Sequence, residues 1–265
     1  MKYVAITFDD GRDDNYTVAY PILKKSGFCA TVYCTTGFID GTWKKKDDWY
    51  SAERALTIQQ LKELKTAGWE IGLHGDKHIT DIIDAKNAID KLRNWGLLEQ
   101  GLGYSLPDSI EDETRLNEFW NKFYPDTISY IRAGRGINTK KLSYRLLFLW
   151  YTYFKSQFAY NLFNKKSIEQ VGIFDNKRVY SIVVRQKDNP KMLARFVEMM
   201  PDNSMIVFMF HSIHRAHNLY KNDPWNWSDI NFELFVEEIK KQESSVQVFT
   251  LKDIVLKRNE LKVTK

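Results

Sequence analysis

The sequence predicts an α/β protein whose strands form a parallel sheet. Short apolar, strand-like runs recur along the whole chain, and helical patterns fill the gaps between them. The strand-like runs are Tyr3–Phe8, Cys29–Thr35, Glu70–His74, Gly103–Leu106, Ile128–Arg132, Val179–Val184, Met205–Phe210 and Val246–Thr250. Repeated strand–helix units imply a parallel sheet covered by helices, either open or closed into a barrel.

Two helices have clear signals. Thr57-x-x-Gln60 forms a capping box before a stripe of apolar residues, and Gly68 ends that helix. The apolar residues at helical spacing are Ile58, Leu61 and Leu64 in this helix, and Phe232, Phe235, Val236 and Ile239 in a later one.

The segment from Leu146 to Phe163 is unusually aromatic. We expect it to form a buried helix that packs on the sheet. The alternative is an exposed face that meets a membrane surface or a lipid-linked sugar.

Composition is that of a soluble globular protein, with 43% hydrophobic and 28% charged residues. The absence of a linker or repeat favours one domain over residues 1–265. The net charge of +5 is spread out, and Lys44-Lys45-Lys46 is followed at once by Asp47-Asp48. This pattern argues against a nucleic-acid partner and favours a solvated loop. The sequence leaves the oligomeric state open.

Cysteine content and the start of the chain favour a reducing, cytoplasmic location. Cys29 and Cys34 lie about 16 Å apart if both belong to one strand, at roughly 3.3 Å per residue, which is beyond disulfide reach. The chain enters a strand directly after Met1-Lys2, with no apolar leader. The longest apolar run, Leu146–Tyr151, is too short to span a bilayer.

Polar residues follow four of the predicted strands. Asp9 and Asp10 follow the first, His74 and His78 the third, Arg132 the fifth and His211 the seventh. Functional groups of parallel α/β folds gather at the carboxyl ends of strands, so we expect these side chains on one rim.

Two imidazoles four residues apart and a carboxylate make a divalent-metal site. A second carboxylate and the strand-end His211 remain for acid–base work. The sequence therefore predicts a metal-dependent hydrolase.

Other polar residues near these motifs receive structural interpretations. Gly11 allows the tight turn out of the first strand, and Asp13 or Asp14 is expected to cap the following helix. Asp76 is expected to be solvated or to contact a ligand residue. His214 and His217 are expected in a loop.

The motif Thr7-Phe8-Asp9-Asp10-Gly11, the His74-x-x-x-His78 pair and His211 together resemble the polysaccharide deacetylase family, the NodB-like carbohydrate esterases. The resemblance runs from residue 3 to about 254, and includes the segments 20–27 and 248–251. It implies an irregular (β/α) barrel of about seven to eight parallel strands.

The resemblance also implies roles for individual residues. Asp10 joins His74 and His78 on zinc, or on another divalent ion such as cobalt or nickel. Asp9 is the catalytic base and His211 the acid. The implied activity is removal of N-acetyl groups from an amino-sugar-containing glycan or glycan precursor, with release of acetate and a free amine.

Two parts of the family pattern differ in this chain. The family's arginine, which steadies the base, usually lies in an Arg-Pro-Pro-Tyr-like segment. Here we assign it to Arg132, in Ile131-Arg132-Ala133, and the alternative is the Leu106-Pro107 strand end without an arginine. The family's Asp-Trp segment is missing from Val179–Asp188, which leaves open the group that tunes His211.

Four tryptophans lie in loops expected to border the site. Trp225 and Trp227 follow the His211 strand, and Trp43 and Trp49 follow the second strand. Aromatic rings stack on the apolar faces of sugars, so these four are candidate substrate contacts; the alternative is that they only anchor their loops.

Three rival functions remain at this point. The first is hydrolysis of another bond on the same fold, in a cyclic imide, a formamide or an O-acetyl ester. The second is a non-catalytic sugar-binding protein, and the third is a non-haem iron oxygenase, which also uses two histidines and a carboxylate.

Overall fold

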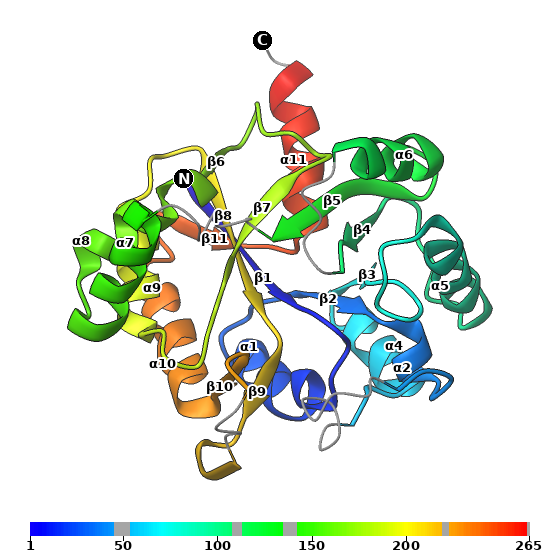
Figure 1. Cartoon of the computed structure of the whole chain (residues 1–265), viewed down its shortest axis with the longest axis horizontal. Helices are drawn as coiled ribbons and strands as arrows, with labels where there is room; N and C mark the ends of the chain where they lie inside the picture. The colour runs from blue at the N-terminus through cyan, green and yellow to red at the C-terminus, as the bar shows by residue number, and fades with distance from the viewer. Residues whose placement is uncertain (45–53, 108–112, 135–141, 219–222, 264–265) are drawn as a thin grey trace.

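Seven parallel strands close into a barrel, because β1 pairs with β2 on one side and with β8 on the other. The computed structural model describes the whole chain except residues 45–53, 108–112, 135–141, 219–222 and 264–265. Figure 1 shows the barrel strands at the centre with helices around them. In barrel order the strands are β1 (Lys2–Phe8), β2 (Thr31–Cys34), β3 (Glu70–Leu73), β4 (Leu102–Ser105), β5 (Ile128–Gly134), β7 (Val179–Val183) and β8 (Ser204–Phe210).

All eight predicted strands are present, and the predicted barrel is confirmed. The eighth, β11 (Val246–Val248), pairs in parallel with β1 outside the barrel. Three short strands were not predicted: β6 (Glu169–Gln170), which pairs antiparallel with β8, and the parallel pair β9 (Ser212–His214) and β10 (Asn226–Ser228). Strands of two or three residues are too short for a period of two to be visible in a sequence.

Helices occupy the connections between strands. They are η1 (Asn15–Ala19), α1 (Tyr20–Lys25), α2 (Thr36–Ile39), α4 (Ile58–Thr66), α5 (Ile82–Asn94), α6 (Glu113–Phe123), α7 (Leu142–Phe154), α8 (Gln157–Asn164), η2 (Lys165–Ser167), α9 (Pro190–Glu198), η3 (Ala216–Asn218), α10 (Asp229–Lys240) and α11 (Leu251–Val263). The Thr57–Gln60 capping box before α4 is confirmed, and Gly68 follows that helix at φ +88°. The predicted apolar stripe of α10 is buried.

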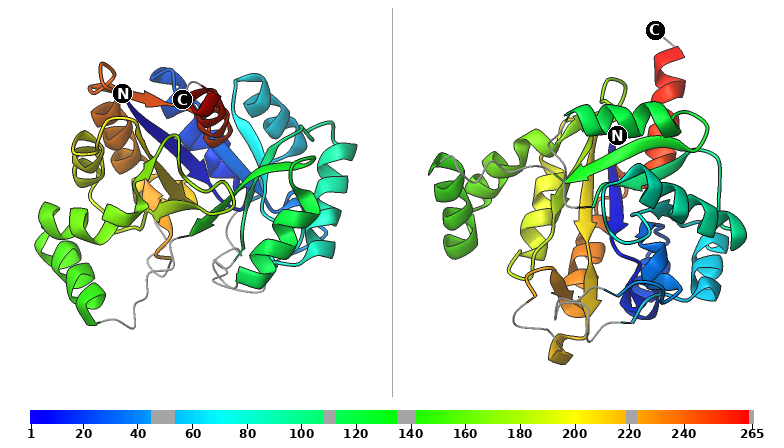
Figure 2. Two further views of the ribbon diagram at one scale, coloured as in Figure 1. Left: turned by 90° about the horizontal axis from the view of Figure 1, so that it is seen from above. Right: turned by 45° about the vertical axis from the view of Figure 1, so that its right-hand side comes forward.

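The expectation of a buried aromatic helix between 146 and 163 is wrong. This segment forms α7 and most of α8, two helices that extend beyond the other helices around the barrel (Figure 2). Of the α7 residues, Tyr151 alone is fully buried. The aromatic content suggested burial, but it lies largely on the outer face of the helix.

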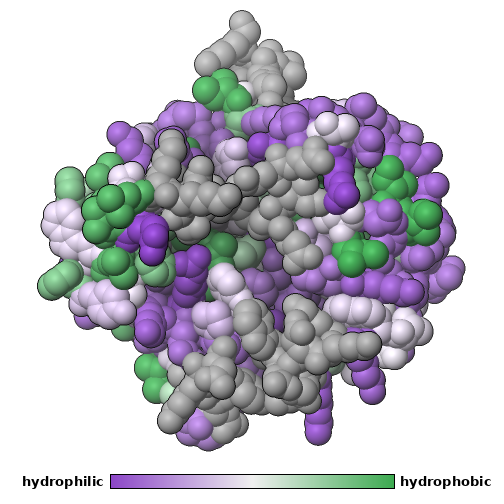
Figure 3. Space-filling view, viewed as in Figure 1, coloured by the Kyte–Doolittle hydropathy of each residue, from purple (hydrophilic) through white to green (hydrophobic). Residues whose placement is uncertain are grey.

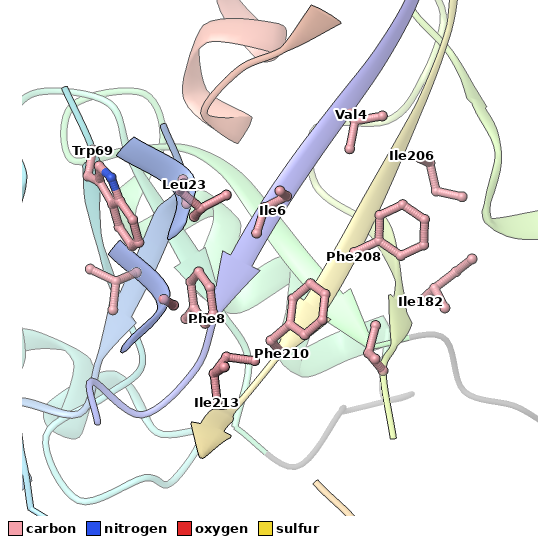
Figure 4. Close-up of a cluster of buried hydrophobic side chains, with 14 of the residues drawn as sticks. Val4, Ile6, Phe8, Leu23, Trp69, Ile182, Ile206, Phe208, Phe210 and Ile213 are labelled. Atoms are coloured by element: carbon pink, nitrogen blue, oxygen red, sulfur yellow. The ribbon is translucent and has the colours of Figure 1, made fainter. Parts of the chain in front are cut away.

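Alternating residues of each strand face opposite sides of the barrel wall. Val4, Ile6 and Phe8 of β1 point outward against the helices, as do Ile206, Phe208 and Phe210 of β8 (Figure 4). The Phe8 and Phe210 rings lie 5.7 Å apart. Residues in between, such as Ala5, Met205 and Val207, face the interior.

A tyrosine pair and a glutamate fill the barrel interior. The hydroxyls of Tyr33 and Tyr130 lie 2.7 Å apart, and Tyr130 donates to the Glu70 carboxylate at 2.9 Å. These rings need space, which glycines provide. A Cβ at Gly72 would lie 2.5 Å from the Tyr33 ring, and one at Gly103 would lie 2.1 Å from the Tyr130 hydroxyl oxygen.

Helix α11 lies over the amino-terminal end of the barrel. The backbone N–H of Leu251 donates to Thr31 Oγ1 at 3.1 Å, and that of Lys252 donates to Glu70 Oε2 at 3.0 Å. The negative Glu70 thus lies at the positive end of the helix dipole. Burial raises the pKa of Glu70, although these hydrogen bonds oppose the change. The barrel is therefore closed at this end.

The interior packing predicts a cost for Gly103→Ala. The new methyl group would overlap the Tyr130 side chain, so one strand or the ring must move. We expect the free energy of unfolding to fall by about 2–3 kcal/mol in denaturant titrations. Gly172→Ala is the matched control, because its Cβ would meet nothing within 4 Å, and it should change stability by less than about 0.5 kcal/mol. Equal effects of the two variants would contradict the assigned packing.

Candidate active site

The two carboxylates at the end of β1 point in different directions because the backbone turns between them. Asp9 keeps the inward register of β1, and its N–H donates to the Phe210 carbonyl of β8 at 3.0 Å. Asp10 has a positive φ of 74° and Gly11 one of 78°. A positive φ is uncommon for a residue with a side chain and often marks a functional position. Both aspartates are buried.

Asp10, His74 and His78 converge on one point at the rim. Asp10 Oδ1 lies 3.6 Å from Nε2 of each histidine, and the three potential ligand atoms are all within 4.8 Å of one another. Asp10 Oδ1 is buried and has no hydrogen-bond partner among the described residues. Two imidazole nitrogens and one carboxylate oxygen suit a divalent transition metal. The residues present therefore fit the metal that the family resemblance implies.

Neighbouring groups hold the two histidines in place. The Ser105 carbonyl lies 2.9 Å from His74 Nδ1, which leaves Nε2 directed into the site. The backbone N–H groups of Asp76 and Lys77 donate to the Asp84 carboxylate at 2.8 and 2.9 Å, and so fix the turn that carries His78. His78 itself has φ 54°.

Asp76 is not solvated. It is buried, and its Oδ1 accepts from Thr36 Oγ1 at 2.8 Å and lies 2.8 Å from Lys91 Nζ. These contacts join the loop between His74 and His78 to α2 and α5. Asp76 therefore supports the loop between His74 and His78.

Arg132 contacts Asp9 across the barrel interior. Its Nη2 donates to Asp9 Oδ1 at 2.7 Å, and its Nη1 donates to Ser181 Oγ at 2.9 Å. Nη2 also donates to Ser105 Oγ. The guanidinium lies 5.0 Å from the centre of the Tyr33 ring. Arg132 is thus fully buried and fixes the orientation of the Asp9 carboxylate, the position expected of the arginine that steadies the base.

A second arginine, Arg12, contacts Asp10, and sequence reasoning missed it. Arg12 Nε donates to Asp10 Oδ2 at 3.0 Å, and Nη1 donates to Ser212 Oγ at 2.6 Å. Nη1 also lies 3.7 Å from Asp223 Oδ2. Burial alone would raise the pKa of Asp10, but Arg12, His211 and the other histidines reverse this and hold it well below its usual value. Oδ2 is occupied by Arg12, so Oδ1 is the oxygen left for a metal.

His211 lies at the end of β8, beside the two aspartates. Burial lowers the pKa of His211 from 6.5 to about 4, although the charges of Asp10 and Asp9 oppose the change. Its Nδ1 is buried and has no hydrogen-bond partner among the described residues. The group that would take the place of the family's Asp-Trp segment is therefore not a hydrogen-bonding carboxylate of the described chain.

The segment after His211 is a strand, so the expected loop position of His214 is wrong. Asp14 does not cap a helix either; its Oδ1 accepts from the Ile213 N–H of β9 at 2.9 Å. His214 Nδ1 lies 3.9 Å from Asp14 Oδ2. His217 lies in η3 and is exposed. Asp14 thus helps to hold the chain that carries His211.

The four candidate tryptophans have different surroundings. Trp225 is half-buried, and its ring centre lies 5.5 Å from that of His211. Trp43 stacks on His78 at 6.3 Å. Trp227 is a wrong prediction as a substrate contact, because it is buried, packs on Phe210 and donates to the Asp188 carbonyl. Trp49 lies outside the described residues.

The backbone N–H groups that follow β2 are already paired with carbonyls of the rim. The N–H groups of Thr35, Thr36 and Gly37 already donate to the carbonyls of Asp10, Gly75 and Asp76. These bonds hold the rim together, and they leave these three groups unable to bind substrate.

The barrel of parallel strands carries two adjacent aspartates and two histidines at the carboxyl ends of its strands. This combination defines the class of the protein. Residues 1–153 match the family model of polysaccharide deacetylases, and the chain belongs to this family.

Individual relatives agree with this assignment. The chain is 38% identical over 78 residues to the YxkH protein of Bacillus subtilis (strain 168), provisionally named a polysaccharide deacetylase. That match spans 29% of this chain and 24% of YxkH. Among solved structures, a family 4 acetyl xylan esterase from Clostridium thermocellum in complex with a cobalt ion superposes with a TM-score of 0.51 at 13% identity. The superposition covers 96% of this chain and 90% of the esterase chain.

A second solved structure has the same fold. The peptidoglycan deacetylase PdaC from Bacillus subtilis superposes with a TM-score of 0.50 at 13% identity, over 99% of this chain and 95% of its own. At these identities the likeness establishes the barrel fold.

The lowered pKa of His211 predicts a pH-dependent loss of stability. Its folded pKa of about 4 lies below the ordinary 6.5, so the unfolded chain binds more protons between these values. The folded state therefore loses stability as the pH falls from 6.5 to about 4. The measurement is made in buffer with a metal chelator, so that no bound ion contributes. The difference in unfolding free energy between wild type and His211→Gln should then change by about 2 kcal/mol across this range.

Two comparisons make this prediction specific. Burial raises the pKa of Asp188 to about 6, so its protonation stabilises the folded state as the pH falls through the same range. This contribution is present in both proteins, and it cancels when the unfolding free energy of the variant is subtracted from that of the wild type. The exposed His217→Gln should follow the wild-type curve. A constant difference between wild type and His211→Gln over this range would contradict the lowered pKa.

Proposed function

We propose that the protein is a metal-dependent deacetylase that removes N-acetyl groups from an amino-sugar-containing glycan. The observation that carries this proposal is the pair of adjacent buried aspartates, each held by its own arginine. Asp10 faces the two histidines, and Asp9 lies beside them, with its Oδ2 3.9 Å from His74 Nε2. This arrangement supports a metal site and a separate base within one rim.

Asp10, His74 and His78 would hold the metal. A divalent ion bound there would lower the pKa of a water molecule and polarise the acetyl carbonyl. Asp9 accepts the proton of the attacking water, and Arg132 keeps its carboxylate in one orientation. Arg12 keeps Oδ2 of Asp10 occupied, so that Oδ1 alone faces the histidines.

His211 supplies the proton that the departing amine needs, because an amine leaves poorly as an anion. At neutral pH this residue is mostly unprotonated in the free protein, since its pKa is lowered to about 4, so it must take up a proton from solvent before it can protonate the amine. Trp225 lies beside His211, and Trp43 lies beside His78. Their rings would stack on the apolar faces of the sugar at two edges of the site.

The proposed roles of Asp9 and Asp10 can be separated by isosteric substitution. We expect Asp10→Asn and His78→Ala to lose zinc or cobalt and activity together. Asp9→Asn should keep the metal and lose roughly 10²–10⁴ in kcat, as for removal of a general base. Metal content is measured by mass spectrometry, and activity as acetate release from N-acetylglucosamine oligomers.

The reverse pattern, with metal lost in Asp9→Asn and kept in Asp10→Asn, would require the two roles to be exchanged. Full activity in protein without a divalent ion would contradict the metal-dependent mechanism. Release of acetate from an O-acetyl ester but never from the amide would favour the esterase alternative.

The role proposed for His211 predicts a dependence on the leaving group. His211→Ala should lose much more activity on an N-acetyl amide than on an aryl acetate, whose phenolate leaves without a proton. Since burial lowers the pKa of His211, we expect the alkaline limb of kcat/KM to lie below 6.5 and to flatten in this variant. His217→Ala, an exposed control, should keep both the limb and the preference. Equal losses on the two substrates would show that His211 positions the substrate instead.

A further inference from the structure

The outer surface of the α7–α8 hairpin is apolar and aromatic. Eight large hydrophobic side chains on it have exposed fractions between 46% and 78%. We call this surface the hairpin face; it consists of Leu142, Leu146, Leu149, Trp150, Tyr153 and Phe154 of α7, and Phe158 and Leu162 of α8. Figure 3 shows pale and green residues gathered at the left of the molecule, where α7 and α8 lie.

The eight side chains form one continuous surface. Those of α7 recur at helical spacing and so share one side of the helix. Phe158 and Leu162 are four residues apart and share one side of α8, and the Trp150 and Phe158 rings are 6.3 Å apart. The opposite sides carry Tyr151, Tyr160 and Phe163, which are buried. The hairpin is therefore amphipathic, and its second apolar side faces outward.

Basic residues border the hairpin face and acidic residues are absent from its sequence. Between residues 142 and 168 the chain has four Lys or Arg and no Asp or Glu. The four basic residues, all exposed, are Arg145, Lys155, Lys165 and Lys166. The whole chain, in contrast, mixes both signs, with 39 basic and 34 acidic residues. An apolar surface whose own two helices carry only basic charges complements a surface of lipid chains and negative headgroups.

We propose that the hairpin face docks on the surface of an anionic phospholipid bilayer. Its aromatic side chains enter the boundary between headgroups and acyl chains, and its basic side chains contact lipid phosphates. The hairpin lies on the membrane and does not cross it, because α7 has 13 residues and α8 has 8, against the roughly 20 that a bilayer requires. No helix in the described part of the chain is long and apolar enough to span one.

The hairpin also contacts the side chains beside the candidate active site. The Arg185 guanidinium lies 5.0 Å from the centre of the Phe148 ring of α7 and 5.5 Å from that of Trp225. Trp225 in turn contacts His211. Docking through the hairpin face would therefore hold the rim of the barrel near the membrane surface, where glycans attached to lipids are found.

Vesicle binding tests the proposal without any assay of deacetylation. The full-length protein is centrifuged with vesicles made of equal parts of phosphatidylglycerol and phosphatidylcholine, and with vesicles of phosphatidylcholine alone. We expect binding to the anionic vesicles that weakens in high salt, and little binding to the neutral ones. The double variant Phe154→Ser/Phe158→Ser should reduce the partition coefficient roughly tenfold or more.

The matched control removes two equally exposed apolar residues elsewhere. Ile173→Ser/Ile230→Ser, at positions exposed by 76% and 64%, should bind like the wild type. Unchanged binding of the Phe154→Ser/Phe158→Ser variant would overturn the proposal, since the general positive charge would then be sufficient. So would a dimer in sedimentation velocity that this variant dissociates, with no vesicle binding by the wild type, because the hairpin face would then join two copies of the chain.

Discussion

The parallel register between β1 and β8 is the constraint on which the site depends. Six successive residues pair, from Tyr3 opposite Met205 to Phe8 opposite Phe210. This pairing closes the barrel and brings Asp9 and His211, the next residue of each strand, to neighbouring places on the rim. Because alternate residues face opposite sides of the wall, a slip of one residue in either strand would turn the group of that strand toward the helices.

Two buried arginines hold two adjacent carboxylates in different orientations. Arg132 comes from the opposite side of the barrel and contacts Asp9, whereas Arg12 comes from the turn after β1 and contacts Asp10. A buried carboxylate without a cationic partner would cost folding free energy. Because the two arginines approach from different directions, they fix the two carboxylates in different orientations. The separation of roles along two neighbouring residues thus depends on where their cations lie.

The strands and the rim could be predicted from sequence because short apolar runs and strand-end positions are local signals. Asp9, Asp10, His74, His78, Arg132 and His211 all carried that signal. Arg12 and Asp84 did not, since a charged residue in a turn or in the first turn of a helix looks solvated until tertiary contacts are known. The outward face of α7 was only the alternative expectation, for a related reason. Aromatic content predicts burial, but only the surroundings of a helix decide which of its sides is covered.

The filled barrel interior determines the route by which molecules reach and leave the site. Tyr33, Tyr130 and Glu70 occupy the space beneath Arg132, and α11 covers the opening below them. In the proposed reaction, water, substrate, acetate and the proton accepted by Asp9 would therefore enter and leave through the carboxyl rim. A long glycan bound across that rim would cover the opening above Asp9, so release of the deacetylated product and exchange of the proton with solvent would occur together.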